Sequence, residues 1–194
     1  MDNSSVPIDN KDRFIKLGIF LPSLFANFRT AINPGCALAI DESLLAYKGR
    51  LSFKQYNPLK RARFGIKLFF MAEAASGFIL NVLPYHGKST HIENDEWTAE
   101  FGVGGATVLT LLRDLLGKAH RVTIDNWFMS VKLARKLLEQ ETYVIGTVKK
   151  TRKEMPKFGN KIKVGESETY SDGNILVERY FCGGRYQSVS YIVC

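Results

Sequence analysis

The alternation of short apolar strands with amphipathic helices between residues 104 and 150 constrains the fold of this chain most tightly. Residues 104–116 (GGATVLTLLRDLL) and 131–139 carry the apolar stripe that is typical of a helix. Residues 120–124 (HRVTI) and 142–150 (TYVIGTVKK) are rich in β-branched residues and alternate in polarity, as strands do. The second half of the chain is therefore expected to build a sheet that helices cover.

The segments before residue 104 predict further strands. Residues 37–41 (ALAID) form a short apolar run, and residues 64–73 and 77–85 indicate a β-hairpin with Gly77 in the turn. Residues 10–30 predict one or two helices. Strands followed by alternating helices and strands predict an α/β fold whose sheet has mixed strand directions.

The residues after 155 differ from the rest in their density of polar turns. Two strands are expected near 175–182 and 188–193, after the polar turn at 171–174 (SDGN). This tail predicts a separate, incomplete β element.

The composition is typical of one globular domain. The chain has 194 residues, of which 45% are hydrophobic and 12% aromatic, enough to bury a core. No apolar run reaches the roughly 20 residues that cross a bilayer, so no membrane partner is expected. Cys36, Cys182 and Cys194 are scattered and odd in number, which favours a reduced intracellular compartment.

Positive charge is concentrated in two blocks. The net charge is +8, and residues 48–67 hold seven cations and no acid, while residues 149–163 hold seven cations and one acid. Either block alone fits an ordinary solvated surface. Together, and with Phe53, Tyr56 and Phe64 interleaved, they favour a surface that follows a phosphate backbone.

Two aspartates follow apolar strands and allow two interpretations. Asp41 follows ALAI and Asp125 follows VTI. If these strands are neighbours, the carboxylates converge and repel unless a hard cation such as Mg²⁺ or Mn²⁺ joins them. Alternatively, Asp41 only ends a strand and Asp125 caps the following helix. Trp127 and Phe128 are expected to pack beneath the second aspartate or to contact DNA.

The motifs around these aspartates resemble the catalytic core of piggyBac-type transposases and of the host genes derived from them. The first block carries the family's four motifs: Ile40-Asp-Glu42, Tyr47-Lys-Gly-Arg50, Phe53 to Lys60, and Gly65-Ile-Lys67. The second block carries Asp125-Asn-Trp-Phe-Met-Ser130 and, after a helix, the run from Gly146 to Pro156. The resemblance extends from about residue 10 to the end of the chain.

The resemblance implies an RNase H-like mixed sheet flanked by helices and a cut-and-paste DNA transposase that acts at TTAA. Three aspartates in that family hold two Mg²⁺ (or Mn²⁺) ions, and Asp41 and Asp125 match the first two, as metal ligands and catalytic residues. DNA is the implied partner, the nucleus the implied location, and a homodimer a possible assembly. The residues expected to contact the DNA backbone are Lys48, Arg50, Lys54, Lys60, Arg61, Arg63, Lys149, Lys150, Arg152 and Lys153.

The chain departs from the family pattern at its end. No Gly-Val-Asp motif with the third aspartate follows Gly146-Thr-Val, and the family's Cys-rich zinc-binding tail is missing. We therefore expect a truncated, catalytically incomplete protein that retains DNA affinity. The alternatives are a host-recruited, non-enzymatic chromatin module and an active subunit that receives its third carboxylate from elsewhere. The expected divisions are a helical lead-in (1–35), the transposase core (36–155) and part of a β-rich insertion (156–194).

Overall fold

A computed structural model describes residues 14, 17–87, 90, 92, 94–159, 162–181 and 189–193, the last of these as backbone only. The elements in chain order are α1 (Phe20–Ala31), β1 (Ala37–Ala46), β2 (Gln55–Tyr56), β3 (Phe64–Glu73), β4 (Ile79–Pro84), α2 (Asp95–Leu112), the 3₁₀ helix η4 (Arg113–Leu115), β5 (Arg121–Ile124), α3 (Val131–Glu139), β6 (Tyr143–Val148), β7 (Ser167–Ser171), β8 (Leu176–Tyr180) and β9 (Val189–Val193).

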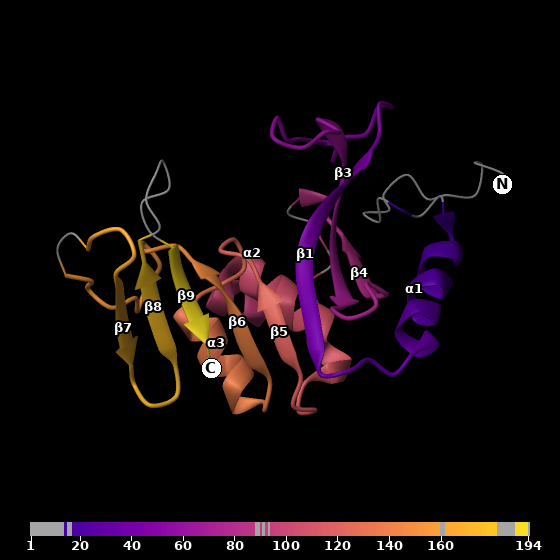
Figure 1. Ribbon diagram of the computed structural model, residues 1–194. Helices are drawn as coiled ribbons and strands as arrows, with labels where there is room; N and C mark the ends of the chain where they lie inside the picture. Colours follow the sequence, from indigo (N-terminus) through magenta and orange to yellow (C-terminus); the bar gives the residue numbers. More distant parts are fainter. Residues whose placement is uncertain are drawn as a thin grey trace.

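The strands of the described residues form one mixed sheet in the order β2-β3-β1-β5-β6-β9-β8-β7, and β4 pairs with β3 (Figure 1). Only β1, β5 and β6 run parallel to one another; the other pairs are antiparallel. The predicted α/β fold with mixed strand directions is confirmed. Because parallel neighbours need a crossover, α3 connects β5 to β6 along one face of the sheet.

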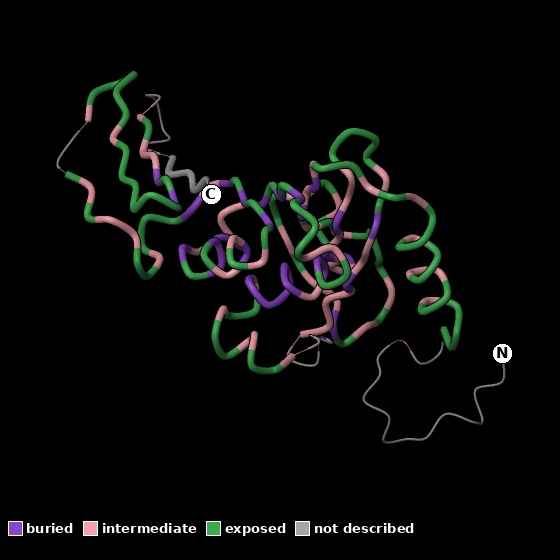
Figure 2. Tube along the Cα trace, turned by 90° about the horizontal axis from the view of Figure 1, so that it is seen from below, coloured by how far each residue is buried: buried purple, intermediate pink, exposed green. Residues whose placement is uncertain are grey.

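The core lies between this face and the helices α2 and α3. On the sheet side, Leu38, Val122 and Val144 are almost fully buried, and on α3 Leu133 and Leu137 are completely buried. Figure 2 shows the buried positions gathered in the centre, whereas α1 and the β7–β8 hairpin are largely exposed. The opposite face of β1, β5 and β6 is the open face of the sheet, where burial along β5 alternates strictly between exposed and buried.

Strand β1 is longer than the sequence predicts. The apolar run ALAI suggested an end at Asp41, but β1 continues to Ala46 because β3 pairs with it along its whole second half, from Asp41↔Phe70 to Ala46↔Gly65. Pairing with β5 stops at Ile40↔Ile124. Asp41 therefore lies in the middle of a strand, at the point where β1 loses one of its two neighbours.

Other segments also differ from expectation. Strand β9 pairs with β6 and β8, so the tail continues the main sheet instead of forming a separate element; residues 182–188 lie outside the described part of the chain. Helix α2 begins at Asp95, because the Asn94 side chain accepts a hydrogen bond from the amide of Glu96, and it is kinked at Gly102 (φ 69°). The division into three segments stays a prediction.

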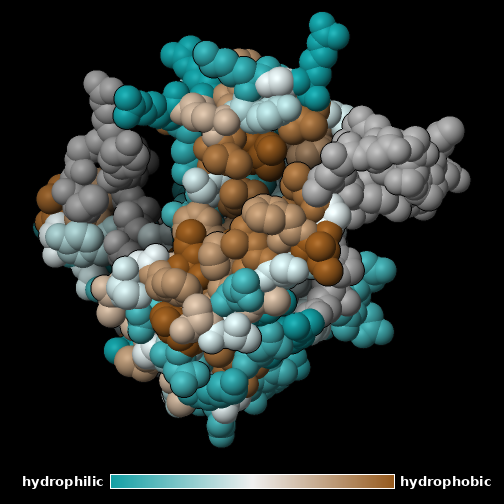
Figure 3. All heavy atoms as spheres, turned by 90° about the vertical axis from the view of Figure 1, so that its right-hand side faces the viewer, coloured by the Kyte–Doolittle hydropathy of each residue, from teal (hydrophilic) through white to brown (hydrophobic). Residues whose placement is uncertain are grey.

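Helix α1 packs along β4 but buries none of its residues. Leu17, Ile19 and Phe20 near its start are exposed. Viewed from this side, hydrophobic residues gather in the middle of the molecule, below a hydrophilic rim (Figure 3). Of the helices in the described residues, none combines the length and apolar character that spanning a membrane requires.

Candidate active site

Asp41 and Asp125 are brought side by side by the parallel pairing of β1 with β5. The ladder runs to Ile40↔Ile124, so the two aspartates are the next positions on neighbouring strands, whose backbones lie about 4.8 Å apart. Asp41 is exposed and alternates with the buried Leu38 and Ile40, so it faces away from the helices, onto the open face. The sequence prediction that the two aspartates lie on adjacent strands is confirmed.

The turn after β5 holds Asp125 in place. Its Oδ1 accepts a hydrogen bond of 2.8 Å from the amide of Trp127, and its carbonyl oxygen accepts from the amides of Phe128 and Met129. Helix α3 is capped by Ser130, whose side chain accepts from the amide of Leu133 at 3.1 Å. The alternative that Asp125 serves as the helix cap is therefore wrong, and sequence reasoning missed Ser130.

An aromatic cluster supports this turn from the core side. The Trp127 ring stacks on Phe69 with 5.2 Å between centroids, and Phe128 packs edge-on against both rings. The Lys67 ammonium lies 4.6 Å from the Trp127 ring and 4.8 Å from the Phe69 ring. Phe128 is 1% exposed, so the core interpretation holds for it, and Trp127 is half-buried against the same cluster. These contacts hold the backbone at Trp127, whose amide donates the hydrogen bond to Asp125.

Glu42 is a third acid near the pair, but alternation directs it to the opposite face from Asp41. Burial raises the pKa of the Glu42 carboxyl above its usual value, and Lys67 opposes this shift. The carboxylates of Asp41 and Asp125 raise it further. Its Oε2 is buried and lacks a hydrogen-bond partner within the described residues. Both aspartates therefore raise the pKa of Glu42, although its side chain lies on the opposite face of the sheet from Asp41.

The two basic blocks leave the sheet on either side of the aspartates. Since β1, β5 and β6 are parallel, their carboxyl ends lie along one edge. Most of the first block, residues 48–63, lies between β1 and β3, and residues 149–153 follow β6. Of the ten predicted DNA-contacting residues, the exposed ones are Lys48, Arg50, Arg61, Arg63, Lys149, Lys150 and Lys153, and the half-buried ones are Lys54, Lys60 and Arg152. Within the described residues, none of the ten forms an ion pair.

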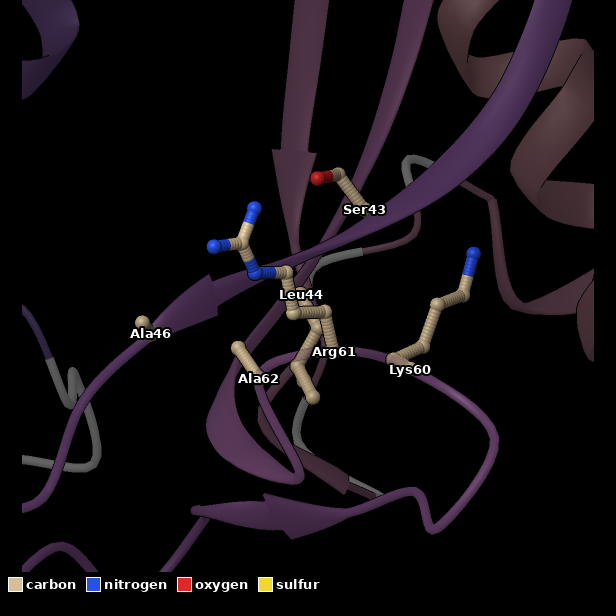
Figure 4. Close-up of a pocket in the computed structure, with 6 residues that line it drawn as sticks. All are labelled: Ser43, Leu44, Ala46, Lys60, Arg61 and Ala62. Carbon is tan, nitrogen blue, oxygen red and sulfur yellow. The ribbon is translucent and has the colours of Figure 1, made fainter.

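A basic pocket of about 530 Å³ lies beside β1, just beyond Asp41. Its lining consists of Ser43, Leu44 and Ala46 from β1 and of Lys60, Arg61 and Ala62 from the loop before β3. In Figure 4 the Lys60 amine and the Arg61 guanidinium lie on either side of Ser43. Two cations next to a hydroxyl and a small apolar wall form a surface that suits a phosphate group.

A second pocket, of about 450 Å³, adjoins Trp127 and includes Lys149, Thr151 and the glycines of α2. Arg152 also lines it, but one of its guanidinium nitrogens donates to the carbonyl oxygens of Asn126 (3.2 Å) and Trp127 (2.7 Å). Arg152 therefore braces the turn after Asp125, a role that sequence reasoning missed. Its predicted contact with DNA, like the others, stays a prediction.

The two aspartates suit a hard divalent cation in their donor chemistry. Each engages one oxygen with a backbone amide, Asp41 with that of Glu42 (2.7 Å) and Asp125 with that of Trp127. Within the described part of the chain, no hydrogen bond reaches the second oxygen of either carboxylate. No cluster of three or more acids, histidines or cysteines suited to a metal occurs among those residues. The site thus offers two carboxylates, which Mg²⁺ accepts together with water.

Known proteins resemble this chain in sequence and in fold. The model of the family described as Transposase IS4 matches residues 1–192. Among solved structures, piggyBac transposase in a synaptic complex with hairpin DNA matches with a TM-score of 0.83 and 26% identity. This match covers 100% of the present chain and 40% of that one. Endonuclease V from Bacillus subtilis matches with a TM-score of 0.37 and 12% identity over 97% of this chain and 78% of its own, too low to support an argument.

The mixed sheet with its covering helices matches the fold of a DDE-type transposase. The chain belongs to the Transposase IS4 family and is piggyBac-like, as its motifs predict. It spans 40% of the length of the piggyBac transposase that it matches. Transposases of this family use divalent metal ions generally.

Proposed function

We propose that this chain binds DNA along the carboxyl edge of β1, β5 and β6, with Asp41 and Asp125 as ligands of Mg²⁺ or Mn²⁺. The observation that carries the proposal is the equal register of the two aspartates on neighbouring parallel strands, with a basic block leaving the same edge on each side. The similar piggyBac transposase forms a synaptic complex with hairpin DNA, which supports DNA as the partner here.

The roles of the residues follow from their chemistry. Asp41 and Asp125 would hold the cation, which when bound supplies Lewis-acid polarisation of a phosphate. The amide of Trp127 keeps one oxygen of Asp125 fixed and leaves the other to a metal. The cations of both blocks would neutralise phosphates on either side of that point.

The reaction, the location in the cell and the assembly of the protein are proposals as well. We propose strand cleavage and transfer at TTAA as the reaction of a complete three-carboxylate site, because the two-metal chemistry needs ligands beyond this pair. With two carboxylates, the chain by itself would bind DNA without cutting it. A chromosomal substrate would place the protein in the nucleus, and a homodimer would hold two DNA ends together.

The test is DNA affinity measured by fluorescence anisotropy over a range of salt concentrations. The variant Lys60→Glu/Arg61→Glu should bind duplex DNA more weakly, and the slope of log K against log salt should fall by about 1 per lost phosphate contact. The control, Lys118→Glu/Arg121→Glu, changes the net charge equally but lies at the amino end of β5, on the opposite edge of the sheet. Equal losses in both variants, or affinity that is indifferent to salt, would overturn the proposal.

A further inference from the structure

The second half of β1, the start of β3 and the chain between them form an arm (residues 45–66) that projects beyond the sheet (Figure 1). Strand β2 pairs with β3 on this arm through only two positions, Gln55↔Gly65 and Tyr56↔Phe64. The arm carries most of the first basic block, and it holds no acidic residue.

The cross-strand pair on the arm consists of two exposed aromatic rings. Tyr56 is 57% exposed and Phe64 is 50% exposed, although their rings contact each other in a tilted arrangement, with 4.8 Å between centroids and 37° between planes. The aromatic residues of the core differ sharply, since Phe69 and Phe128 are almost completely buried. A cross-strand aromatic pair stabilises a hairpin by about 0.2–1 kcal/mol, which explains the contact between the rings. Tyr56 nevertheless keeps more than half of its surface exposed.

Cations surround this pair. The Lys54 ammonium lies 5.5 Å from the centre of the Phe64 ring and donates a hydrogen bond to the carbonyl of Gly49. Arg61 and Arg63, between the two ring-bearing residues, are both exposed. Phe64 is thus flanked by Tyr56 and by a cation, and the ring face left for a ligand is that of Tyr56.

The pair also lies on the same side of the sheet as Asp41. Residues opposite each other in an antiparallel pair lie on the same face of the sheet, and so does every second residue along each strand. The pairs Asp41↔Phe70 and Leu45↔Ile66 therefore place Phe64 on the same face as Asp41. The next opposite position is Tyr47, whose amide donates a hydrogen bond to the Phe64 carbonyl. Asp41 and Tyr47 are six positions apart along the extended chain, a distance of about 20 Å at 3.3 Å per residue. This is the length of roughly six nucleotides at 3.4 Å each.

An exposed ring near cations that form no ion pair within the described residues suits single-stranded nucleic acid, because a base stacks on the ring while the cations follow the backbone. A duplex offers its phosphates but keeps its base faces stacked inside. We propose that Tyr56, backed by Phe64, is a stacking platform for an unpaired base of a DNA strand that the arm holds near Asp41 and Asp125. This inference rests on the DNA binding proposed above and adds the kind of DNA that the arm selects.

The experiment compares single-stranded and duplex oligodeoxynucleotides of the same length, about 12 nucleotides, within the site sizes of such surfaces. The substitution Tyr56→Leu keeps apolar bulk but removes the ring, and should weaken single-strand binding about fivefold while changing duplex binding less than about twofold. Tyr56→Phe should bind as the unchanged chain does. A 2-aminopurine base in the single strand should be quenched by the unchanged chain and by Tyr56→Phe, but not by Tyr56→Leu.

Leu59→Ala is the matched control, because Leu59 lies in the same loop and is 94% exposed but carries no ring. It should leave both affinities unchanged. Suppose that duplex binding depends on salt but that Tyr56→Leu leaves single-strand binding unchanged. This result would overturn the stacking platform and leave the proposed function intact. An equal loss of affinity for duplex and for single-stranded DNA in Tyr56→Leu would also overturn the stacking platform and leave the proposed function intact. Failure of the unchanged chain to bind either DNA at low salt would overturn both proposals.

Discussion

Replacing Gly104 by alanine tests whether α2 and the turn after Asp125 are packed as tightly as the structure indicates. A methyl group at Gly104 would lie 2.7 Å from the carbonyl oxygen of Trp127 and 3.3 Å from the Cα of Phe128, both backbone atoms. Ordinary contact begins at 3.4 Å, so the turn must move by 3.4 − 2.7 = 0.7 Å. The same carbonyl accepts the 2.7 Å hydrogen bond from Arg152, which this shift would stretch or break.

Two opposing effects decide the sign of the change in stability. Alanine is a better helix former than glycine by about 1 kcal/mol, which alone would stabilise the chain. Overpacking costs about 1–3 kcal/mol, and loss of a hydrogen bond from a charged group about 1.5–3 kcal/mol. Because the turn can relax, these costs overlap, and we expect a net destabilisation of about 1–2 kcal/mol.

Urea denaturation followed by tryptophan fluorescence measures this change. With a slope of about 2 kcal/mol per molar urea, the midpoint of Gly104→Ala should fall by roughly 0.5–1 M. Val103→Ala is the control, since Val103 is exposed on the same helix and its truncation brings no backbone clash. A midpoint that rises for Gly104→Ala, as helix propensity alone requires, would refute the tight packing of α2 against this turn.

Three further predictions concern the cap, the hairpin and the site. Ser130→Ala should lower stability by about 1 kcal/mol and Ser130→Asp should not, because only alanine lacks a capping oxygen; equal melting temperatures would contradict this. Hydrogen bonds from the amide of Ile175 and its neighbour lower the pKa of Asp172 from 3.8 to about 2 in the folded chain. Its stabilising effect is therefore complete above pH 3.8 and is lost as the pH falls to about 2. The difference in urea midpoint between the unchanged chain and Asp172→Asn should shrink over that range, and a constant difference would argue against it. Finally, the chain should not nick supercoiled plasmid with Mg²⁺ or Mn²⁺, because two carboxylates carry two negative charges against the four of a metal pair. Metal-dependent nicking that both Asp41→Asn and Asp125→Asn abolish would show that a third ligand is present.

The sequence predicted the elements that local pattern determines. Residues 64–73 coincide with β3, and residues 131–139 coincide with α3, because each has a clear period of polarity and a clear turn or cap at its end. The adjacency of Asp41 and Asp125 was predicted from their positions after two apolar strands together with the family resemblance, and the pairing of β1 with β5 confirms it. The family resemblance favoured a metal ligand over a cap at Asp125; the structure gives the cap to Ser130, and the role of Asp125 as a ligand stays a prediction.

What the sequence did not predict depends on tertiary partners. The length of β1 is decided by β3, since the residues from Ser43 to Ala46 are strand only because that neighbour continues. Strand β2 has two residues and no periodicity of its own. Helix α2 was predicted too short, although Asn94 followed by acids in the first turn is a helix-start signal that could have been used. The bracing by Arg152 of carbonyls some 25 residues earlier in the chain has no local signature.

The uninterrupted course of β1 has a mechanical consequence. Its first half is held on both sides, by β3 and β5, and its second half by β3 alone. The strand is therefore supported on both sides up to Ile40 and on one side beyond it, and Asp41 is the first residue of the part that has one neighbour. Ala46 lies about 17 Å further along, at 3.3 Å per residue. The arm is therefore connected to Asp41 by a continuous strand, whereas Asp125 is held by the hydrogen bonds of its own turn. Asp41 and Asp125 thus differ in how their backbones are held, one by a strand paired on a single side and the other by a hydrogen-bonded turn.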